Sequence, residues 1–496
     1  MASLAAGRAQ TTAFLPLIVV LIVLRAATAS HLPLSFDEAY FWLWSRHLAI
    51  SYFEHPPLIA LAIRAGTTLL GETSLGVRLM SLVASVAASW AVWRAAAVIF
   101  ADDTSAWTAC AFFNLTLMLT SQSMGATPDI FVMTGSAFLL WCVEELERTQ
   151  NGWWWLAAAL SLGIALLTKY TAFFLAISLG LWLLFTPKGR RWLGSPWPYL
   201  SAVLAAAFLI PNLMWNAAHG WISFKYQFGR IGAGHNNPLH LLEFLAGQLA
   251  LASPVILALA AIGLGRETRR KFASPLSMSA LLVWPALLYF TIHSLHDRVQ
   301  GNWPSFIYPG LALLAAAAAE NAHGTAMRWL ARLAVPVALL ILAVCYLQAW
   351  TGLLKLGKGD PVARMTAVGF DAVAKQASAL AESDHAAALV TTRYVNTGWL
   401  AFYTHSHIPV LQATEVYRWT DAPAASQQLL NSPLLYVTEH PERELRFVKP
   451  FFSQVTFKTC VPRMSGGIVV DNFCFYTLRG FRSGGRSVRI PIAYPP

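Results

Sequence analysis

The chain has 496 residues, of which 56% are hydrophobic and only 12% are charged, and its mean hydropathy is +0.52. A soluble protein rarely carries so few charges, because its surface needs ionic groups to stay dispersed. The formal net charge of +11 lies in short basic clusters between apolar runs, without the basic and aromatic interleaving that binds single strands. The composition therefore predicts a helical membrane protein that contacts anionic lipid and does not bind nucleic acid.

Apolar runs long enough to cross a bilayer as helices recur along the first 350 residues. The first run could be read as a signal peptide, since "ATA" precedes Ser30, but it is long and more runs follow, so we interpret it as a retained span. The stretch 153–186 has the alternative reading of one interrupted span. We expect about eleven spans, at 12–29, 78–100, 105–122, 130–146, 153–168, 171–186, 198–215, 244–264, 275–293, 304–320 and 330–350.

Positive charge is densest in the loops 187–191 and 265–271 and around Arg328 and Arg332. Cytoplasmic loops are enriched in Lys and Arg, so this distribution predicts a cytoplasmic N-terminus. We therefore expect a multi-pass membrane protein. Its periplasmic segments are 31–77, 216–243, 294–303 and everything after about 351.

After residue 351 the sequence changes to that of a soluble α/β domain. "RMTAVGFDAVAKQASALAE" has the period of an amphipathic helix, and "AALVTTRY", "PLLYVTE" and "RFVKPFFSQVTF" are typical of strands. We expect a membrane module over 1–350, with the outer loop 31–77, and a periplasmic domain over 351–496. In an oxidising compartment Cys460 and Cys474 close a disulfide, unless they are two separate buried thiols. The other cysteines lie in spans and are expected to be packing residues: Cys110, Cys142 and Cys345.

Acidic residues gather in the first periplasmic loop, and ionisable groups at membrane depth are usually functional. "LSFDEAYFWLWSRHL" holds Asp37 and Glu38. Tyr40, Trp44 and His47 follow at helical spacing, which predicts a helix along the membrane surface with its aromatic residues at the lipid interface. The alternative is that the acids only cap this helix. Capping needs one acid, so an adjacent pair indicates a second role.

Other charged residues follow in the periplasmic segments. "YFEHPPL" adds Glu54 and His55 before a double proline that favours an extended turn. "ATPDIF" holds Asp129, for which an N-cap is the alternative reading. Lys169 in "LLTKYTAF" faces outward against the positive-inside bias, although a lone lysine can also snorkel to the interface. Two further outward-facing bases are Arg230 and Arg298.

Acids and bases on one membrane face suit chemistry at a lipid phosphate. Lys and Arg pair with phosphate oxygens, and a carboxylate can take a proton from an attacking hydroxyl. The sequence has no Walker loop, paired-histidine zinc motif or nucleophile elbow, which argues against nucleotide hydrolysis. A lipid flippase or transporter is the second reading, although transporters usually carry midplane charges and repeated halves. A non-catalytic assembly or sensor protein is the third.

Six motifs, in order within residues 10–320, resemble those of a known family. "FDEAYFWLWSRHL", "YFEHPPL", "TPD", "LTKY", "PNLMWNAAHGWISFKYQFGR" and "NWPSFIYPG" are similar to segments of the GT-C-fold membrane glycosyltransferases, the group of the protein O-mannosyltransferases and lipid A aminoarabinose transferases. The resemblance implies a GT-C fold, a polyprenyl-phosphate-linked sugar donor, inversion at the anomeric carbon and catalysis on the periplasmic face. The acceptor stays open between lipid A or its core, another lipid or glycan, and protein hydroxyls.

The resemblance also implies residue roles. Asp37 becomes the base or the carboxylate that orients the acceptor, supported by Glu38, and Asp129 becomes a second acid near the acceptor. The groups that match holders of the donor phosphate are Lys169, Arg230, His55 and, less closely, Arg298. The aminoarabinose transferases have lysine at the position of His55. A histidine is only partly charged near neutral pH, so we expect the affinity of His55 for phosphate to depend on pH.

Of the features that the resemblance implies, a metal site has the least support from the residues present. The histidine that binds metal in the aminoarabinose transferases corresponds to Gln227, and amides are poor zinc ligands. A site containing Glu54 would instead need His235, His55 or His219. We expect no essential cofactor, with a divalent metal ion as the open alternative.

Overall fold

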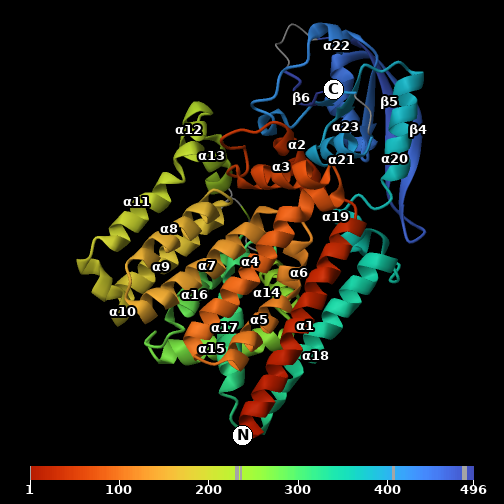
Figure 1. The fold of residues 1–496 in the computed structure, drawn as a ribbon. Helices are drawn as coiled ribbons and strands as arrows, with labels where there is room; N and C mark the ends of the chain where they lie inside the picture. The colour runs from red at the N-terminus through yellow and green to blue at the C-terminus, as the bar shows by residue number, and fades with distance from the viewer. Residues whose placement is uncertain (1, 230–233, 235–236, 405–407, 483–488, 496) are drawn as a thin grey trace. The chain divides into compact units, whose positions relative to one another are not determined.

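The computed structural model describes residues 2–229, 234, 237–404, 408–482 and 489–495, drawn in Figure 1. The chain forms two compact units, each assembled from separate stretches. Unit 1 comprises Met1–Ala29, Glu54–Ala62 and Arg78–Cys345, and unit 2 comprises Ser30–Phe53, Ile63–Val77 and Tyr346–Pro496. Most of the loop 31–77, which the sequence analysis assigned to the membrane module, is thus grouped with the C-terminal part of the chain.

Unit 1 is built from helices, as expected. They are α1 (Ala2–His31), α4 (Ser74–Phe100), α5 (Asp103–Asn114), α6 (Leu117–Ser123), α7 (Pro128–Thr149), α8 (Trp153–Leu166), η1 (Tyr170–Ala172), α9 (Phe173–Phe185), α10 (Pro187–Arg190), η2 (Arg191–Gly194), α11 (Trp197–Ala207), α12 (Ile210–Ala218), α13 (Ile222–Gly229), α14 (Pro238–Ala252), α15 (Pro254–Arg269), α16 (Ser277–Ser294), η3 (Ser305–Ile307), α17 (Tyr308–Glu320) and α18 (Thr325–Thr351). Helix α3 (Leu58–Leu70) is divided between the two units, and the unit boundaries also cut the ends of α1, α4 and α18.

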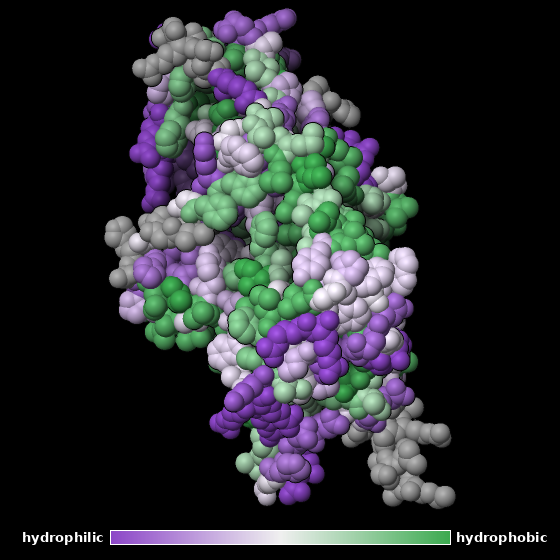
Figure 2. All heavy atoms as spheres, turned by 90° about the vertical axis from the view of Figure 1, so that its left-hand side faces the viewer, coloured by the Kyte–Doolittle hydropathy of each residue, from purple (hydrophilic) through white to green (hydrophobic). Residues whose placement is uncertain are grey.

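Within the described residues, four helices are long and apolar enough to cross a membrane, or up to seven if each bent pair counts as one span. Each predicted run coincides with a helix or a pair of helices, but the predicted number of spans is not confirmed. Hydrophobic side chains gather over the middle of one face, with hydrophilic ones beyond them (Figure 2). Exposed residues of α8, α9 and α11 include Leu160, Ile177, Leu184, Leu200 and Val203. Apolar surface of this extent suits lipid.

The predicted run 244–264 is wrong as a single straight helix. Helices α14 and α15 meet there at an angle of 102°. Ser253 between them has φ +67°, outside the helical region, and Pro254 has no N–H with which to continue the hydrogen bonds of α14. The run 198–215 is divided in a milder way, because α11 and α12 are bent by 41°.

Unit 2 contains the predicted α/β domain. Its six-stranded sheet has the order β4-β5-β3-β1-β2-β6, and only the pairs β3-β1 and β1-β2 are parallel. The strands are β1 (Ala388–Thr391), β2 (Val410–Gln412), β3 (Leu434–Thr438), β4 (Phe452–Ser465), β5 (Ile468–Phe481) and β6 (Ile492–Tyr494). The helical elements are α2 (Phe36–Arg46), η4 (Gly357–Gly359), α19 (Pro361–Met365), α20 (Asp371–Ser383), α21 (Tyr394–Tyr403), η5 (Val416–Arg418), α22 (Gln427–Asn431), α23 (Pro441–Val448) and η6 (Lys449–Phe451).

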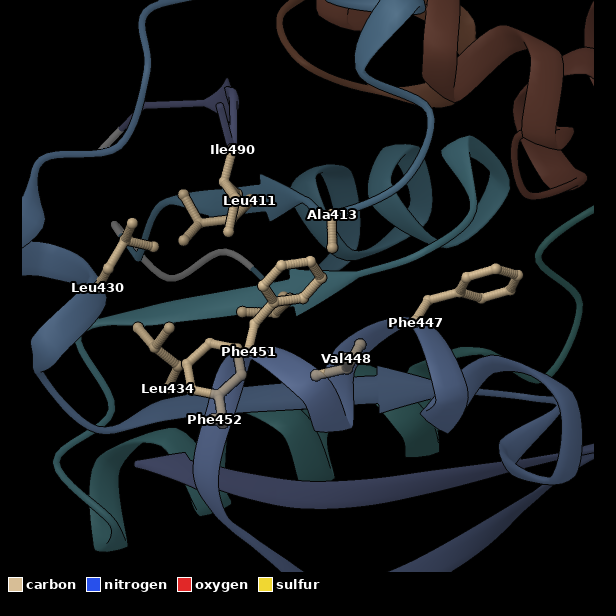
Figure 3. A pocket seen from close by; sticks show the side chains of 10 residues that line it. Leu411, Ala413, Leu430, Leu434, Phe447, Val448, Phe451, Phe452 and Ile490 are labelled. Carbon is tan, nitrogen blue, oxygen red and sulfur yellow. The ribbon is translucent and has the colours of Figure 1, made fainter. Parts of the chain in front are cut away.

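The central strands are buried along their whole length, as parallel strands covered on both faces must be. The predicted strand 446–457 begins only at Phe452, because α23 and η6 occupy the preceding residues. An apolar cavity lies beside β1 and β2 (Figure 3). The described residues around it are all apolar and mostly belong to the domain's hydrophobic core, for example Leu411, Leu434 and Phe452. We therefore assign the cavity to packing and not to chemistry.

Cys460 on β4 and Cys474 on β5 face each other across the hairpin and form a disulfide, so the pairing predicted from sequence is confirmed. Replacing both with Ser should lower the free energy of unfolding of unit 2 by about 3 kcal/mol, the chain-entropy value for a loop of roughly 15 residues. Thermal unfolding in detergent measures this, and reduced wild-type protein is the control. Equal midpoints for oxidised wild type and the double variant would show that the hairpin needs no cross-link.

Candidate active site

Helix α2 carries the first acidic pair, and one of the two acids closes its N-terminus. The backbone N–H of Ser35 donates to Glu38 Oε2 at 2.8 Å, and the backbone N–H of Glu38 donates to Ser35 Oγ at 3.3 Å. This is a reciprocal capping box, and Glu38 is only 1% exposed. Glu38 therefore stabilises the start of the helix. Asp37, which is half-buried, is not part of the box and accepts a hydrogen bond from the Tyr394 hydroxyl at 3.1 Å.

The aromatic side chains of α2 pack against protein, which corrects the predicted placement at the lipid interface. Tyr40, Trp42 and Trp44 are at most 4% exposed. Their ring neighbours within unit 2 include Tyr394, Phe402, Trp419 and Tyr494. An apolar helix face has the same sequence pattern whether lipid or protein covers it, so the pattern alone could not decide between them.

The end of α2 is held by Tyr52. Its ring stacks on Trp44 at 4.4 Å. Its hydroxyl lies 3.0 and 3.1 Å from the carbonyl oxygens of Trp44 and His47 and donates its single proton between these two acceptors. Burial raises the pKa of Tyr52 to about 12, so the hydroxyl remains a donor even at alkaline pH, where an exposed tyrosine begins to ionise. Both ends of α2 are thus fixed, and so is the backbone that carries Asp37.

Unit 1 holds the second group of charged residues, a buried pair between Asp129 and Lys169. Lys169 Nζ lies 2.8 Å from Asp129 Oδ1 and 2.9 Å from Oδ2, and the two residues are 8% and 2% exposed. Asn302 Nδ2 donates to Oδ2 at 3.0 Å and Ser305 Oγ to Oδ1 at 3.2 Å. Charge-assisted bonds therefore reach both carboxylate oxygens.

These contacts rule out two alternative roles that the sequence left open, a helix cap for Asp129 and an interfacial position for Lys169. Thr127, and not Asp129, is the N-cap of α7, so the Asp129 carboxylate does not serve as a helix cap. Lys169 is buried and paired, so it does not snorkel to an interface. A buried ion pair loses favourable hydration and needs this complete set of partners to persist.

Two further motif segments lie beside this pair. The backbone N–H of Leu58, in "YFEHPPL", donates to the carbonyl oxygen of Leu167 at 3.1 Å, two residues before Lys169. Gln227 Nε2 donates to the carbonyl oxygen of Glu54 at 3.1 Å. The structure thus brings the segments of Glu54, Lys169 and Gln227 together within unit 1.

Other predicted site residues are placed differently. The Arg298 side chain is 70% exposed and pairs with Glu243 at 2.9 Å, whereas Asn302 and Ser305, farther along the same segment, reach Asp129. Arg230 and His235 lie outside the described residues. Among the residues that the structure does describe, no three His, Cys, Asp or Glu side chains are grouped to hold a metal ion. His219 stacks on Trp215, with its Nδ1 2.7 Å from the carbonyl oxygen of that residue.

Asn302→Ala should lower kcat/KM for any reaction at this site roughly 10- to 100-fold, because it removes a hydrogen bond to a charged carboxylate. Arg298→Ala, in the same segment, is the matched control and should change kcat/KM by less than about threefold, since an exposed ion pair contributes little. Steady-state kinetics of both variants checks this. A larger loss in Arg298→Ala would return Arg298 to the group of substrate-binding residues.

The chain is similar to several known proteins. Residues 54–215 match the family model described as dolichyl-phosphate-mannose-protein mannosyltransferase, a range that includes Asp129 and Lys169. The chain is 26% identical over 285 residues to the lipid A galacturonosyltransferase RgtD of Rhizobium johnstonii, and this match covers 56% of the chain and 59% of RgtD. The crystal structure of ArnT from Cupriavidus metallidurans bound to undecaprenyl phosphate superimposes with a TM-score of 0.63 at 16% identity, covering 95% of this chain and all of ArnT.

The chain has the fold of the GT-C glycosyltransferases. The apo form of the same ArnT agrees, with a TM-score of 0.61 at 17% identity over 95% of this chain and 99% of ArnT. The arabinofuranosyltransferase AftD from Mycobacteria gives 0.51 at 15% identity, over 94% of this chain and 40% of AftD. The GT-C resemblance seen in the motifs is thereby confirmed, and the GT-C chain is a membrane protein.

Proposed function

We propose that this GT-C chain is an inverting glycosyltransferase that moves a sugar from a polyprenyl-phosphate-linked donor to lipid A or another envelope lipid or glycan. The observation that carries the proposal is the buried Asp129–Lys169 pair, which lies inside the segment that matches the family model. Two donors from outside that segment, Asn302 and Ser305, complete its set of partners. A cation buried with this many partners is costly and is usually kept for function. The name of RgtD and the ligand of ArnT support the acceptor and the donor carrier.

In the proposed reaction, Asp37 takes the proton from an acceptor hydroxyl while the oxygen attacks the anomeric carbon of the sugar. The bond between that carbon and the donor phosphate breaks, and its electron pair leaves with the polyprenyl phosphate. Lys169, assisted by Arg230 and His55, stabilises the phosphate charge. Asp129 holds Lys169 in place. With an ionised phosphate as acceptor, no proton is removed, and Asp37 only orients the acceptor.

We place this reaction on the periplasmic face of the bacterial inner membrane, where lipid-linked sugars and envelope acceptors meet. The experiment is mass spectrometry of envelope lipids and glycans from wild type, a deletion strain, and the deletion strain carrying wild-type protein or Asp37→Asn. The expected result is a lipid-linked sugar that is lost on deletion and restored only by the wild-type gene. Loss of sugar from proteins instead would favour the second candidate, a protein O-glycosyltransferase, which the description of the family model suggests. An unchanged envelope would contradict both.

A further inference from the structure

Tyr394 of the C-terminal domain lies against the carboxylate proposed as the base. It is the first residue of α21, and its hydroxyl donates to Asp37 Oδ1 at 3.1 Å. Its ring packs edge-on against Tyr40 at 5.0 Å and Phe36 at 6.2 Å. Both partners belong to α2, so Tyr394 holds the turn of α2 from which Asp37 projects.

The register between the two helices is fixed by a close backbone approach. Gly398 lies one turn after Tyr394 on α21, and a Cβ at Gly398 would come within 3.0 Å of atoms of Ala39 and Tyr40. Ala39 and Tyr40 are fully buried. A side chain at Gly398 would require α2 to shift by a few tenths of an ångström, and Tyr394 lies on the same face of α21.

A third element holds Tyr394 from its other side. Glu415, in the segment after β2, accepts a hydrogen bond from the Tyr394 backbone N–H at 2.5 Å through Oε2. Its Oε1 lies 3.4 Å from Arg418 Nε. The Arg418 guanidinium in turn lies 4.2 Å from the centroid of the Tyr394 ring, close enough for a cation–π interaction. The charged groups around the Asp37–Tyr394 contact in unit 2 therefore include Glu38, Glu415 and Arg418.

We propose that Tyr394 is a positioning residue for the transfer reaction, which rests on the proposed function: its hydroxyl orients the Asp37 carboxylate and stabilises its ionised form. The C-terminal domain then contributes directly to the active site through the segments that follow β1 and β2. Two features favour this over a purely structural contact. The capping of α2 is already provided by Ser35 and Glu38, and the tyrosine is clamped at its backbone and its ring by Glu415 and Arg418.

The test compares Tyr394→Phe with Tyr403→Phe in the full-length protein. Tyr403 lies on the same helix, and its hydroxyl accepts a hydrogen bond from the Leu34 backbone N–H at 2.7 Å, so its loss is structural. The assay uses the donor and acceptor that the envelope analysis identifies, with undecaprenyl-phosphate galacturonic acid and purified lipid A as the first pair, over a range of pH. We expect kcat of Tyr394→Phe to fall about tenfold and the acidic limb of its pH profile to move to higher pH, because the carboxylate loses a donor to its charged form. Tyr403→Phe should melt earlier and keep the wild-type acidic limb.

A double-mutant cycle provides the second measurement. In the Asp37→Asn background, Tyr394→Phe should change the residual rate by no more than about twofold, since its effect passes through Asp37. A normal kcat and an unshifted limb in Tyr394→Phe, or full additivity in the cycle, would overturn the positioning role while leaving the proposed function intact. An envelope whose lipids and glycans are unchanged by deletion of the gene would instead overturn the proposed function and the inference together.

Discussion

Asp37→Asn is expected to lower kcat for sugar transfer about 1,000-fold while leaving the fold unchanged. The amide has nearly the same shape as the carboxylate and can still bind the Tyr394 hydroxyl, but it cannot accept the proton of an acceptor hydroxyl. General-base catalysis of this kind is worth about 10²- to 10⁴-fold. The measurement is kcat of the purified variant, with its melting temperature recorded in parallel.

Asp371→Asn is the matched control, because Asp371 also lies in the first turn of a helix of unit 2, α20, and is exposed there. Its kcat should equal that of wild type. A normal rate in Asp37→Asn would mean that the acceptor arrives already ionised or that another group removes the proton. Loss of expression in Asp37→Asn alone would point to a structural role for the carboxylate.

Lys169→Met is expected both to abolish transfer and to destabilise unit 1 by about 3–5 kcal/mol, the usual cost of leaving one member of a buried ion pair without its partner. The reason is that Asp129 would keep only its bonds to Asn302 and Ser305. Adding Asp129→Asn to Lys169→Met removes the uncompensated charge. The double variant should recover most of the lost stability and none of the activity.

Thermal melting and transfer assays on the single and double variants separate the two roles of the pair. Lys358→Met is the control for removal of a lysine from an ion pair, since Lys358 is 73% exposed and lies 3.8 Å from Asp471; its cost should be below about 1 kcal/mol. If the double variant recovered activity together with stability, the pair would be structural, and the donor phosphate would need another ligand.

Much of the fold could be predicted from the sequence, because its strongest signals are local. Long apolar runs predict helices. Near residue 351 the sequence changes from these runs to the pattern of an α/β domain, which predicts a sheet with buried parallel strands. The break at Ser253 also had a local signal, since Pro254 favours a new helix start. That signal was outweighed by the unbroken hydrophobicity of the run around it.

The sequence indicated candidate site residues but not how they pair. Asp129 and Lys169 were both chosen because charge is costly at membrane depth, yet the sequence could not show that they bind each other. Charge alone indicated Arg298, whereas the neutral donors Asn302 and Ser305, a few residues farther along, reach Asp129. The capping role of Glu38 had a readable signal in "SFDE", a Ser followed three residues later by Glu.

The contact between α2 and α21 has a consequence for how the protein is made. Tyr394 follows Asp37 by 357 residues, and at about 5–20 residues per second the ribosome needs roughly 20 to 70 seconds to synthesise the stretch between them. During this time the five aromatic side chains of α2 remain exposed, because α21, the helix that will cover them, has not yet been synthesised. A nascent chain with these side chains exposed is a target for chaperones and proteases. A stop codon anywhere before α21 would leave them exposed permanently.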